Sequence, residues 1–132
     1  MKYMLDTDTC IYLIVRKFPQ LEAKAKNQAP GSLMVSAITA AELAFGVAKS
    51  QRHAHNQAIL AQFLGGMTIL PWPVQAMWNF AELKQHLQLL GKPIGPYDML
   101  IAAHAMFEDV TLVSNNVREF ERVQGLRLEN WL

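Results

Sequence analysis

Three acidic residues stand where a parallel sheet would gather them. Asp6 comes directly after a short apolar run, Glu42 lies one turn into the helix expected after a second apolar run, and Asp98 opens a later helical segment. In open α/β sheets, ligands bind at the edge where the parallel strands end. If the strands before these residues are neighbours, the three carboxylates converge at that edge.

Converging carboxylates favour a particular chemistry. Held within a few ångströms of one another, they repel, and each raises the pKa of the others. A divalent cation removes this cost, and oxygen ligands without Cys or His favour a hard ion such as Mg²⁺ or Mn²⁺. Such an ion, with water ligands remaining, suits phosphodiester hydrolysis because it activates water and neutralises charge in the transition state.

Each carboxylate also has a simpler interpretation as a helix cap. Thr39 and Glu42 fit a capping box, in which Glu42 binds the backbone of its own helix. Asp98 fits an N-cap, and Asp6 can cap the helix that follows it. Three caps need not converge, whereas three metal ligands must. The spacing alone does not decide between the two interpretations.

Short apolar runs alternate with longer helical patterns along the chain, which is typical of βα units and a parallel sheet. Gly91 stands where a helix C-cap belongs, and residues 92–97 are expected not to be helical. The expected fold is α/β, with a short central parallel sheet flanked by helices. We expect strands at 3–5, 33–35, 67–70, 110–113 and 126–128, and helices at 7–15, 19–26, 39–50, 51–64, 74–90 and 98–107.

Composition narrows the possible classes. Of 132 residues, 52% are apolar and 17% are charged, which excludes a disordered chain and leaves apolar surface for a partner. The net charge of +1 gives no general support to nucleic-acid binding, although a local basic stripe would suffice. Cys10 is the single cysteine, which excludes disulfides and Cys-based zinc sites, and we expect it to be buried. We find no membrane span and no signal peptide, and so expect a soluble, cytoplasmic protein.

Four ordered motifs resemble those of the PIN-domain ribonucleases, specifically the VapC-type toxins of prokaryotic toxin–antitoxin pairs. Together they extend over essentially the whole chain, which implies a single PIN-like ribonuclease domain over residues 1–132. The motifs are YMLDTDTCI at 3–11, SAITAAELAFG at 36–46, PIGPYDMLIAAH at 93–104 and LVSNNVREF at 112–120.

The resemblance implies an endoribonuclease that depends on Mg²⁺ or Mn²⁺ and cleaves structured RNA, with tRNA as the expected substrate. It assigns Asp6, Glu42 and Asp98 as catalytic acids, with Asp6 and Asp98 as metal ligands. It also implies a homodimeric toxin that a cognate VapB-type antitoxin neutralises. A larger toxin–antitoxin assembly would then contact operator DNA, and only through the antitoxin.

Two positions depart from the family pattern. Asp8 stands where the first motif most often has Asn, and Asn116 stands where many members carry a fourth acid. Asn116 can ligate or orient a water but supplies no charge, whereas Glu119, one helical turn later, can compensate. This departure puts a second metal in doubt and leaves the hydrolase interpretation intact.

Other polar and aromatic residues are weaker candidates. Thr7 and Ser114 can position metal-bound water, with turn or cap roles as the alternative. Among the basic residues, Lys49 included, Arg118 is the best candidate for a phosphate contact because it lies in the fourth motif. We expect His104 to be a satisfied core or surface histidine, not a base, and Trp78 to lie in the core or in a dimer interface.

Three other classes fit less well. A phosphatase of the haloacid-dehalogenase type would share the Asp6-Thr-Asp8 start but needs a later paired-acid motif, which the chain lacks. A dinucleotide-binding domain needs Gly-x-Gly-x-x-Gly after the first strand, which is also absent. A non-catalytic PIN-like binding module would be marked by loss of the acids, and all three are present.

Overall fold

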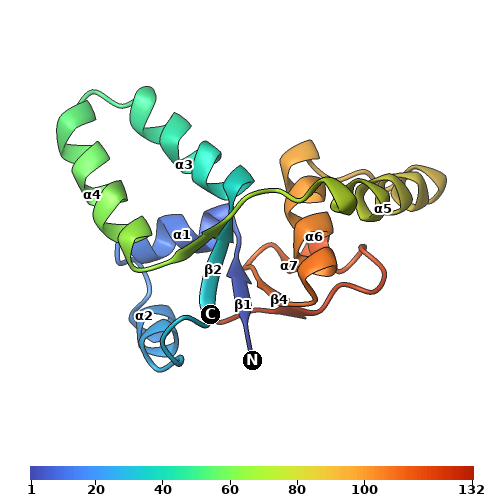
Figure 1. The fold of residues 1–132 in the computed structure, drawn as a ribbon, viewed down its shortest axis with the longest axis horizontal. Coiled ribbons are helices and arrows are strands. Elements are labelled where there is room, and N and C mark those ends of the chain that lie inside the picture. The colour runs from blue at the N-terminus through green and yellow to red at the C-terminus, as the bar shows by residue number, and fades with distance from the viewer.

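A five-stranded, fully parallel sheet forms the centre of the computed structural model, which describes all 132 residues (Figure 1). The strands are β1 (Tyr3–Leu5), β2 (Leu33–Ser36), β3 (Thr68–Leu70), β4 (Thr111–Val113) and β5 (Leu128–Glu129). The helices are α1 (Thr7–Ile14), α2 (Pro19–Lys26), α3 (Ala37–Ala48), α4 (His53–Gly65), α5 (Met77–Leu89), α6 (Pro96–Glu108) and α7 (Val117–Phe120), with a 3₁₀ turn η1 (Val74–Ala76) before α5.

The strand order is β3-β2-β1-β4-β5, so β1 lies between β2 and β4 as the convergence of the acids requires. Tyr3 pairs with Leu33 on one side and with Thr111 on the other. The carboxyl ends of these three strands therefore meet at one edge of the sheet. This confirms the expected α/β fold.

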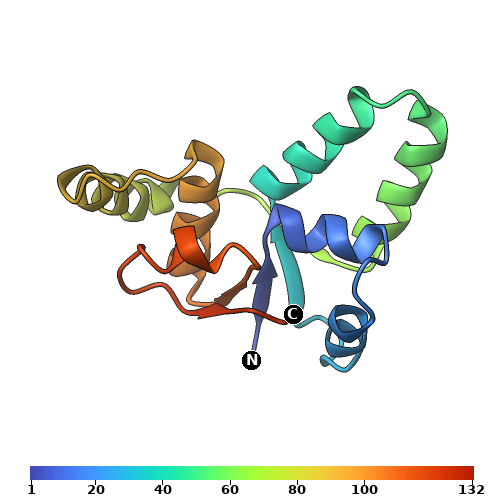
Figure 2. The same cartoon turned by 180° about the vertical axis from the view of Figure 1, so that it is seen from behind.

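Helices cover both faces of the sheet. Figure 1 and the reverse view in Figure 2 show α1 to α4 gathered on one side of the strands and α5 to α7 on the other. Side chains alternate between the two faces along each strand. Met4 and Met34 pack in the core beneath α5 and α6, whereas Leu5 and Val35 pack in the core beneath α1 and α3. Burial on both faces explains why the strands read as continuous apolar runs.

Two helices begin earlier than the sequence pattern indicated. Helix α3 starts at Ala37 because Ser36 is its N-cap and accepts a hydrogen bond from the Ile38 N–H at 3.1 Å. The alternative interpretation of Thr39 and Glu42 as a capping box is therefore wrong. Helix α6 starts at Pro96, at N1, where the fixed φ of proline suits a helix. Its N-cap is Gly95, so Asp98 lies inside the first turn and is not the cap.

Several smaller predictions can be compared directly with the structure. Cys10 is completely buried, as expected. Gly91 ends α5 with a φ of +66°, and the Lys92 N–H donates to the Leu87 carbonyl at 3.0 Å, as in a Schellman cap. Trp78 is 66% exposed, so it does not lie in the core of this chain. None of the helices combines the length and the apolar character needed to cross a membrane.

Candidate active site

Asp6 lies at the centre of the predicted site and is almost completely buried, at 3% exposure. One oxygen of its carboxylate accepts from the Thr9 N–H at 2.9 Å, which makes Asp6 the N-cap of α1. The other accepts from the Ser114 hydroxyl, just after β4, at 2.6 Å. Burial raises the pKa of Asp6, while the bonds from Ser114 and Thr9 lower it and nearby Asp8 raises it slightly. Asp6 therefore both caps a helix and faces the sheet edge.

Glu42 lies one turn into α3 and is bound by a residue from another helix. The Thr7 hydroxyl, at the start of α1, donates to Oε1 of Glu42 at 2.6 Å. Glu42 thus makes a tertiary contact at the carboxyl ends of β1 and β2 instead of capping its own helix.

Asp98 lies near enough to the other acids for their charges to change its pKa. Its pKa rises to about 7, first through burial and then through the nearby charges of Glu119, Asp6 and Glu42. Its protonated carboxyl also makes a hydrogen bond with Glu119, which raises the pKa further. Four carboxyl groups therefore lie close enough for their charges to interact, including all three predicted from strand positions.

The fourth position contains a residue pair. Asn116 is the N-cap residue of α7, and its Nδ2 donates to Oε2 of Glu119 at 2.8 Å. Its backbone N–H donates to the Ser114 hydroxyl at 2.8 Å. Glu119 thus faces Asp98, while Asn116 binds Glu119. Arg118 is exposed on the same short helix.

Neutral donors hold three of the four acids. Ser114 binds Asp6, Thr7 binds Glu42 and Asn116 binds Glu119. Thr7 and Ser114, predicted to position water, are here bonded to the carboxylates themselves. Since these donors carry no positive charge, they orient the acids without cancelling their negative charge.

The donor set fits a hard cation by its chemistry. The groups at this edge are carboxylates, hydroxyls and one amide, all oxygen donors of the kind that Mg²⁺ and Mn²⁺ prefer. As the side chains stand, no group of three His, Cys, Asp or Glu residues has the geometry of a metal-holding group. Metal binding therefore stays a prediction.

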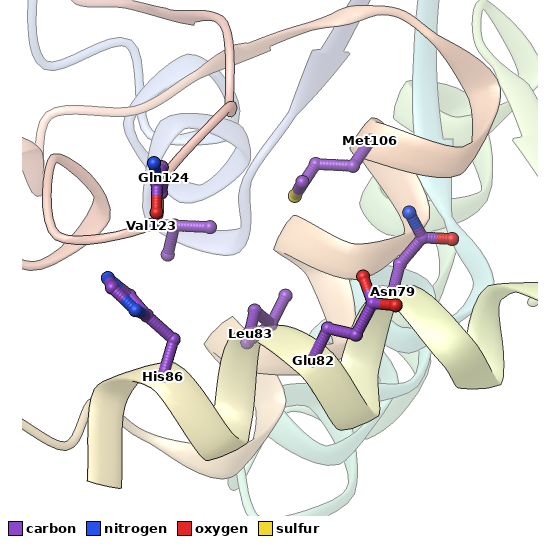
Figure 3. Close-up of a pocket in the computed structure, with 7 residues that line it drawn as sticks. All are labelled: Asn79, Glu82, Leu83, His86, Met106, Val123 and Gln124. Atoms are coloured by element: carbon purple, nitrogen blue, oxygen red, sulfur yellow. The ribbon is translucent and has the colours of Figure 1, made fainter. Parts of the chain in front are cut away.

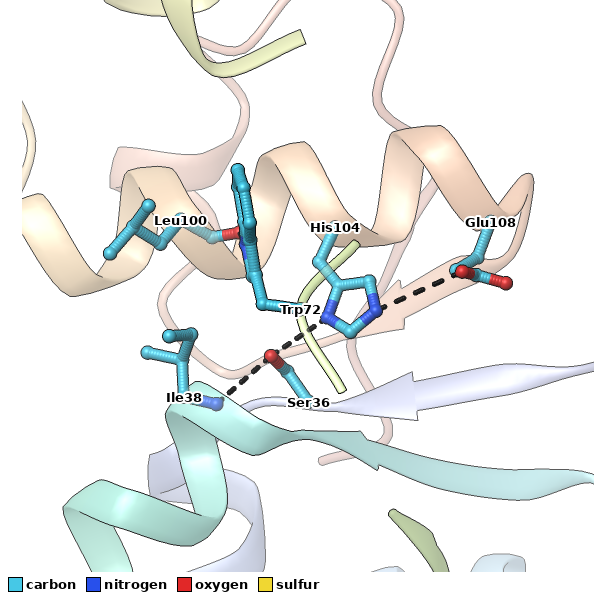
Figure 4. A network of polar contacts seen from close by, with 6 residues as sticks. All are labelled: Ser36, Ile38, Trp72, Leu100, His104 and Glu108. Carbon is cyan, nitrogen blue, oxygen red and sulfur yellow. Dashed lines mark hydrogen bonds and ion pairs between the residues drawn. The ribbon is translucent and has the colours of Figure 1, made fainter. Parts of the chain in front are cut away.

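His104 is buried on α6, the helix that carries Asp98, and its ring points toward Ser36 at the start of α3, the helix that carries Glu42 (Figure 4). Its Nδ1 lies 2.8 Å from the hydroxyl of Ser36, the N-cap of α3. Its Nε2 has no hydrogen-bond partner and lies 3.9 Å from Oε1 of Glu108. The expectation of a satisfied histidine is thus confirmed at Nδ1 and wrong at Nε2.

The burial of His104 predicts a pH-dependent stability. Burial lowers its pKa to about 4, whereas in the unfolded chain the pKa is about 6.5. Between these values the unfolded state binds more protons than the folded state. The contribution of His104 to the free energy of unfolding therefore decreases as the pH is lowered, by up to about 3 kcal/mol. Urea unfolding of the wild type and of His104→Gln, from about pH 7 to about pH 4, measures this contribution.

The comparison of the two proteins isolates His104. Asp98 titrates in the same range with the opposite sign, because its raised pKa makes the folded state more stable as pH falls. That effect is common to both proteins and cancels in the difference. His55→Gln, at an exposed position, is the control. Parallel pH profiles for the wild type and His104→Gln would contradict the prediction.

Two cavities differ in their relation to the acids. One of about 180 Å³, between α5, α6 and the segment after α7, contains none of the predicted site residues (Figure 3). A larger one of about 620 Å³ opens beside Glu42 and Thr7. Its lining includes Tyr97, which the sequence analysis did not single out although it directly precedes Asp98. The larger cavity is lined by Thr7, Asp8, Ile11, Ile38, Ala41, Glu42, Phe45, Gly46, Lys49 and Tyr97.

Comparisons with known proteins agree with this fold. The PIN domain family model matches residues 3–126. Ribonuclease VapC2 of Haemophilus influenzae (strain KW20) is 46% identical over 132 residues, which cover 100% of this chain and 99% of that protein. The tRNA(fMet)-specific endonuclease VapC of Salmonella typhimurium is 37% identical over 131 residues, covering 99% and 98%.

Solved structures give the same result. The crystal structure of DNA-bound VapBC from Salmonella typhimurium matches with a TM-score of 0.94 and 36% identity, over 100% of this chain and 99% of that one. VapBC2 from Rickettsia felis, bound to a promoter DNA fragment, matches with a TM-score of 0.90 and 39% identity over all of both chains. The chain belongs to the PIN-domain family, among its VapC-type ribonucleases.

Proposed function

We propose that this protein is the toxin of a VapBC-type pair and that it hydrolyses structured RNA, tRNA in particular, with Mg²⁺ or Mn²⁺. The observation that carries the proposal is the geometry at the carboxyl edge of the sheet, where hydrogen bonds from Ser114, Thr7 and Asn116 hold the carboxylates of Asp6, Glu42 and Glu119. Burial and the charges of these neighbouring acids raise the pKa of Asp98 to about 7, in agreement with this arrangement. Such a site has an electrostatic cost that a bound divalent cation would remove. Oxygen donors alone surround it, which favours a hard ion.

The residues divide into ligands and positioning groups. Asp6 and Asp98 would hold the ion, with Glu42 and Glu119 completing the acidic set. Ser114, Thr7 and Asn116 fix the directions of three of these carboxylates through bonds of 2.6 to 2.8 Å. When bound, the ion would lower the pKa of a coordinated water and stabilise negative charge on the phosphate. The chain's contribution is to keep the acids converged and oriented before it binds.

The proposed partners and the proposed substrate are inferred from similar proteins. One relative is named a tRNA(fMet)-specific endonuclease, and two similar structures are VapBC complexes with DNA. We therefore propose that a cognate VapB-type antitoxin neutralises this protein. The proposal includes a homodimer within a larger toxin–antitoxin assembly, which contacts operator DNA through the antitoxin.

Cleavage of tRNA(fMet) by the purified protein tests the proposal. We expect cleavage with Mg²⁺ or Mn²⁺, its loss with a chelator and its return when the metal is restored, because the acids alone repel and cannot activate water. The cognate antitoxin should suppress the same reaction. Undiminished cleavage in the presence of the chelator would overturn the metal assignment, and no cleavage of any structured RNA would overturn the substrate.

A further inference from the structure

The cavity of about 620 Å³ is continuous with the acidic site, because Thr7 and Glu42 line it. Apart from the acids, its lining includes two aromatic rings and a cation: Tyr97 from the first turn of α6, Phe45 from α3, and Lys49, the C-cap of α3. Its volume lies within the roughly 300–1,000 Å³ typical of small-ligand sites. The cavity is therefore large enough for a single nucleotide but too small for a base-paired RNA helix.

Both aromatic rings are largely open to solvent. Tyr97 is 57% exposed and Phe45 is 65% exposed. Packing of the hydrophobic core therefore does not explain the presence of either ring. Lys49 places its Nζ 5.3 Å from the centre of the Phe45 ring, within cation–π range, so the positive charge is held beside an aromatic face.

Charge and shape favour an unpaired nucleotide as the occupant. Unpaired RNA bases stack on aromatic side chains, while lysine contacts phosphate as a point charge. In this cavity the rings and the lysine share a wall with Glu42, one of the carboxylates that would act on the phosphodiester bond. Tyr97 and Glu42 line the same cavity, so a base stacked on Tyr97 would lie on the side of the cavity where the acids would act on the phosphate.

We propose that Tyr97 and Phe45 form a stacking site for an unpaired base next to the scissile phosphate, and that Lys49 binds an adjacent phosphate. The proposal rests on the proposed ribonuclease function and adds to it the residues that would contact the nucleotide beside the cleaved bond. Tyr97 acts by its ring face, so its hydroxyl is dispensable.

The kinetic test compares wild type, Tyr97→Phe and Tyr97→Leu in cleavage of tRNA(fMet) with Mn²⁺. Loss of one base–aromatic stack weakens binding by about tenfold, so Tyr97→Leu should raise KM by about that factor with kcat little changed. Tyr97→Phe keeps the ring and should match the wild type. Phe107→Leu, which removes an exposed ring at the other end of α6, is the matched control.

A spectroscopic test reads stacking without cleavage. In an Asp98→Asn background, a short single-stranded RNA carrying one 2-aminopurine should lose fluorescence on binding, because the base stacks on a ring. Adding Tyr97→Leu should restore the fluorescence, and adding Tyr97→Phe should not. Thermal unfolding of each variant shows that it is folded.

The outcomes separate this proposal from the proposed function. Absence of cleavage by the wild type would count against the ribonuclease, while the fluorescence would still report stacking. An unchanged KM in Tyr97→Leu overturns the stacking site, and so does an equal loss in Tyr97→Phe. If Tyr97→Leu weakens only antitoxin binding, the cavity belongs to the antitoxin and the proposal is wrong.

Discussion

Replacing Asp98 with asparagine should lower RNA cleavage by orders of magnitude and, without metal, make the protein more resistant to heat. The variant removes one negative charge from a group of four carboxyls. Above about pH 7 Asp98 is ionised beside Glu119, Asp6 and Glu42, and its raised pKa means that the folded state bears this cost. Asparagine has nearly the same shape, and its amide can still donate to Glu119, so the fold keeps its contacts and loses the repulsion.

Melting temperatures with and without Mn²⁺ separate the two effects. At pH 8 without metal, Asp98→Asn should melt several degrees above the wild type, and at pH 4, where the carboxyl is protonated, the gap should close. Adding Mn²⁺ should raise the melting temperature of the wild type more than that of the variant, because a ligand that binds only the folded state stabilises it. Glu82→Gln, at an exposed acid of α5, should change neither the melting temperature without metal nor the increase caused by Mn²⁺.

A folded Asp98→Asn protein that cleaves RNA at the wild-type rate would remove Asp98 from the site. A variant that melts below the wild type at pH 8 would show that the four acids do not repel in the free protein. Activity and stability should change in opposite directions, which is expected where a site is assembled at the expense of stability.

The centre of the sheet was predictable because β1, β2 and β4 are mostly buried, and polar residues mark the ends of β1 and β2. Asp6 follows β1 and Ser36 ends β2, and both are helix N-caps. The errors lie where two cap candidates compete. Ser36 and Thr39 both suit an N-cap, and Ser36, which is the N-cap, also contacts His104, 68 residues away in the sequence. Such a contact belongs to tertiary structure and leaves no local pattern.

The acids were predictable from their positions at strand ends, but their partners were not. Ser114 is 108 residues from Asp6, and Thr7 is 35 residues from Glu42. Sequence spacing gives no means of matching such donors and acceptors. For the same reason Thr7 and Ser114 were linked to water and not to the carboxylates. Tyr97 could not be predicted as a site residue, because a single exposed aromatic residue belongs to no periodic pattern.

The departure at the fourth position leads to the second large expected effect. Glu119→Gln should reduce cleavage by about a hundredfold or more, because it removes the charge that faces Asp98. Asn116→Ala should cost about tenfold, since Asn116 only orients Glu119 through its 2.8 Å bond and outer positioning groups have effects of that order. Cleavage rates measured against Mn²⁺ concentration give both values and show whether metal affinity or the maximal rate has changed.

A double variant makes the assignment sharper. Asn116→Asp places an acid where many family members have one, so in a Glu119→Gln background it should restore part of the lost activity and of the Mn²⁺ affinity. Asn116→Ala in that background should cost little more, because Asn116 then has no carboxylate to orient. The reverse ranking, with Asn116→Ala crippling and Glu119→Gln silent, would make the amide a direct ligand. In that case the site would operate with three acids, and Glu119 would serve only to hold Asn116 in place.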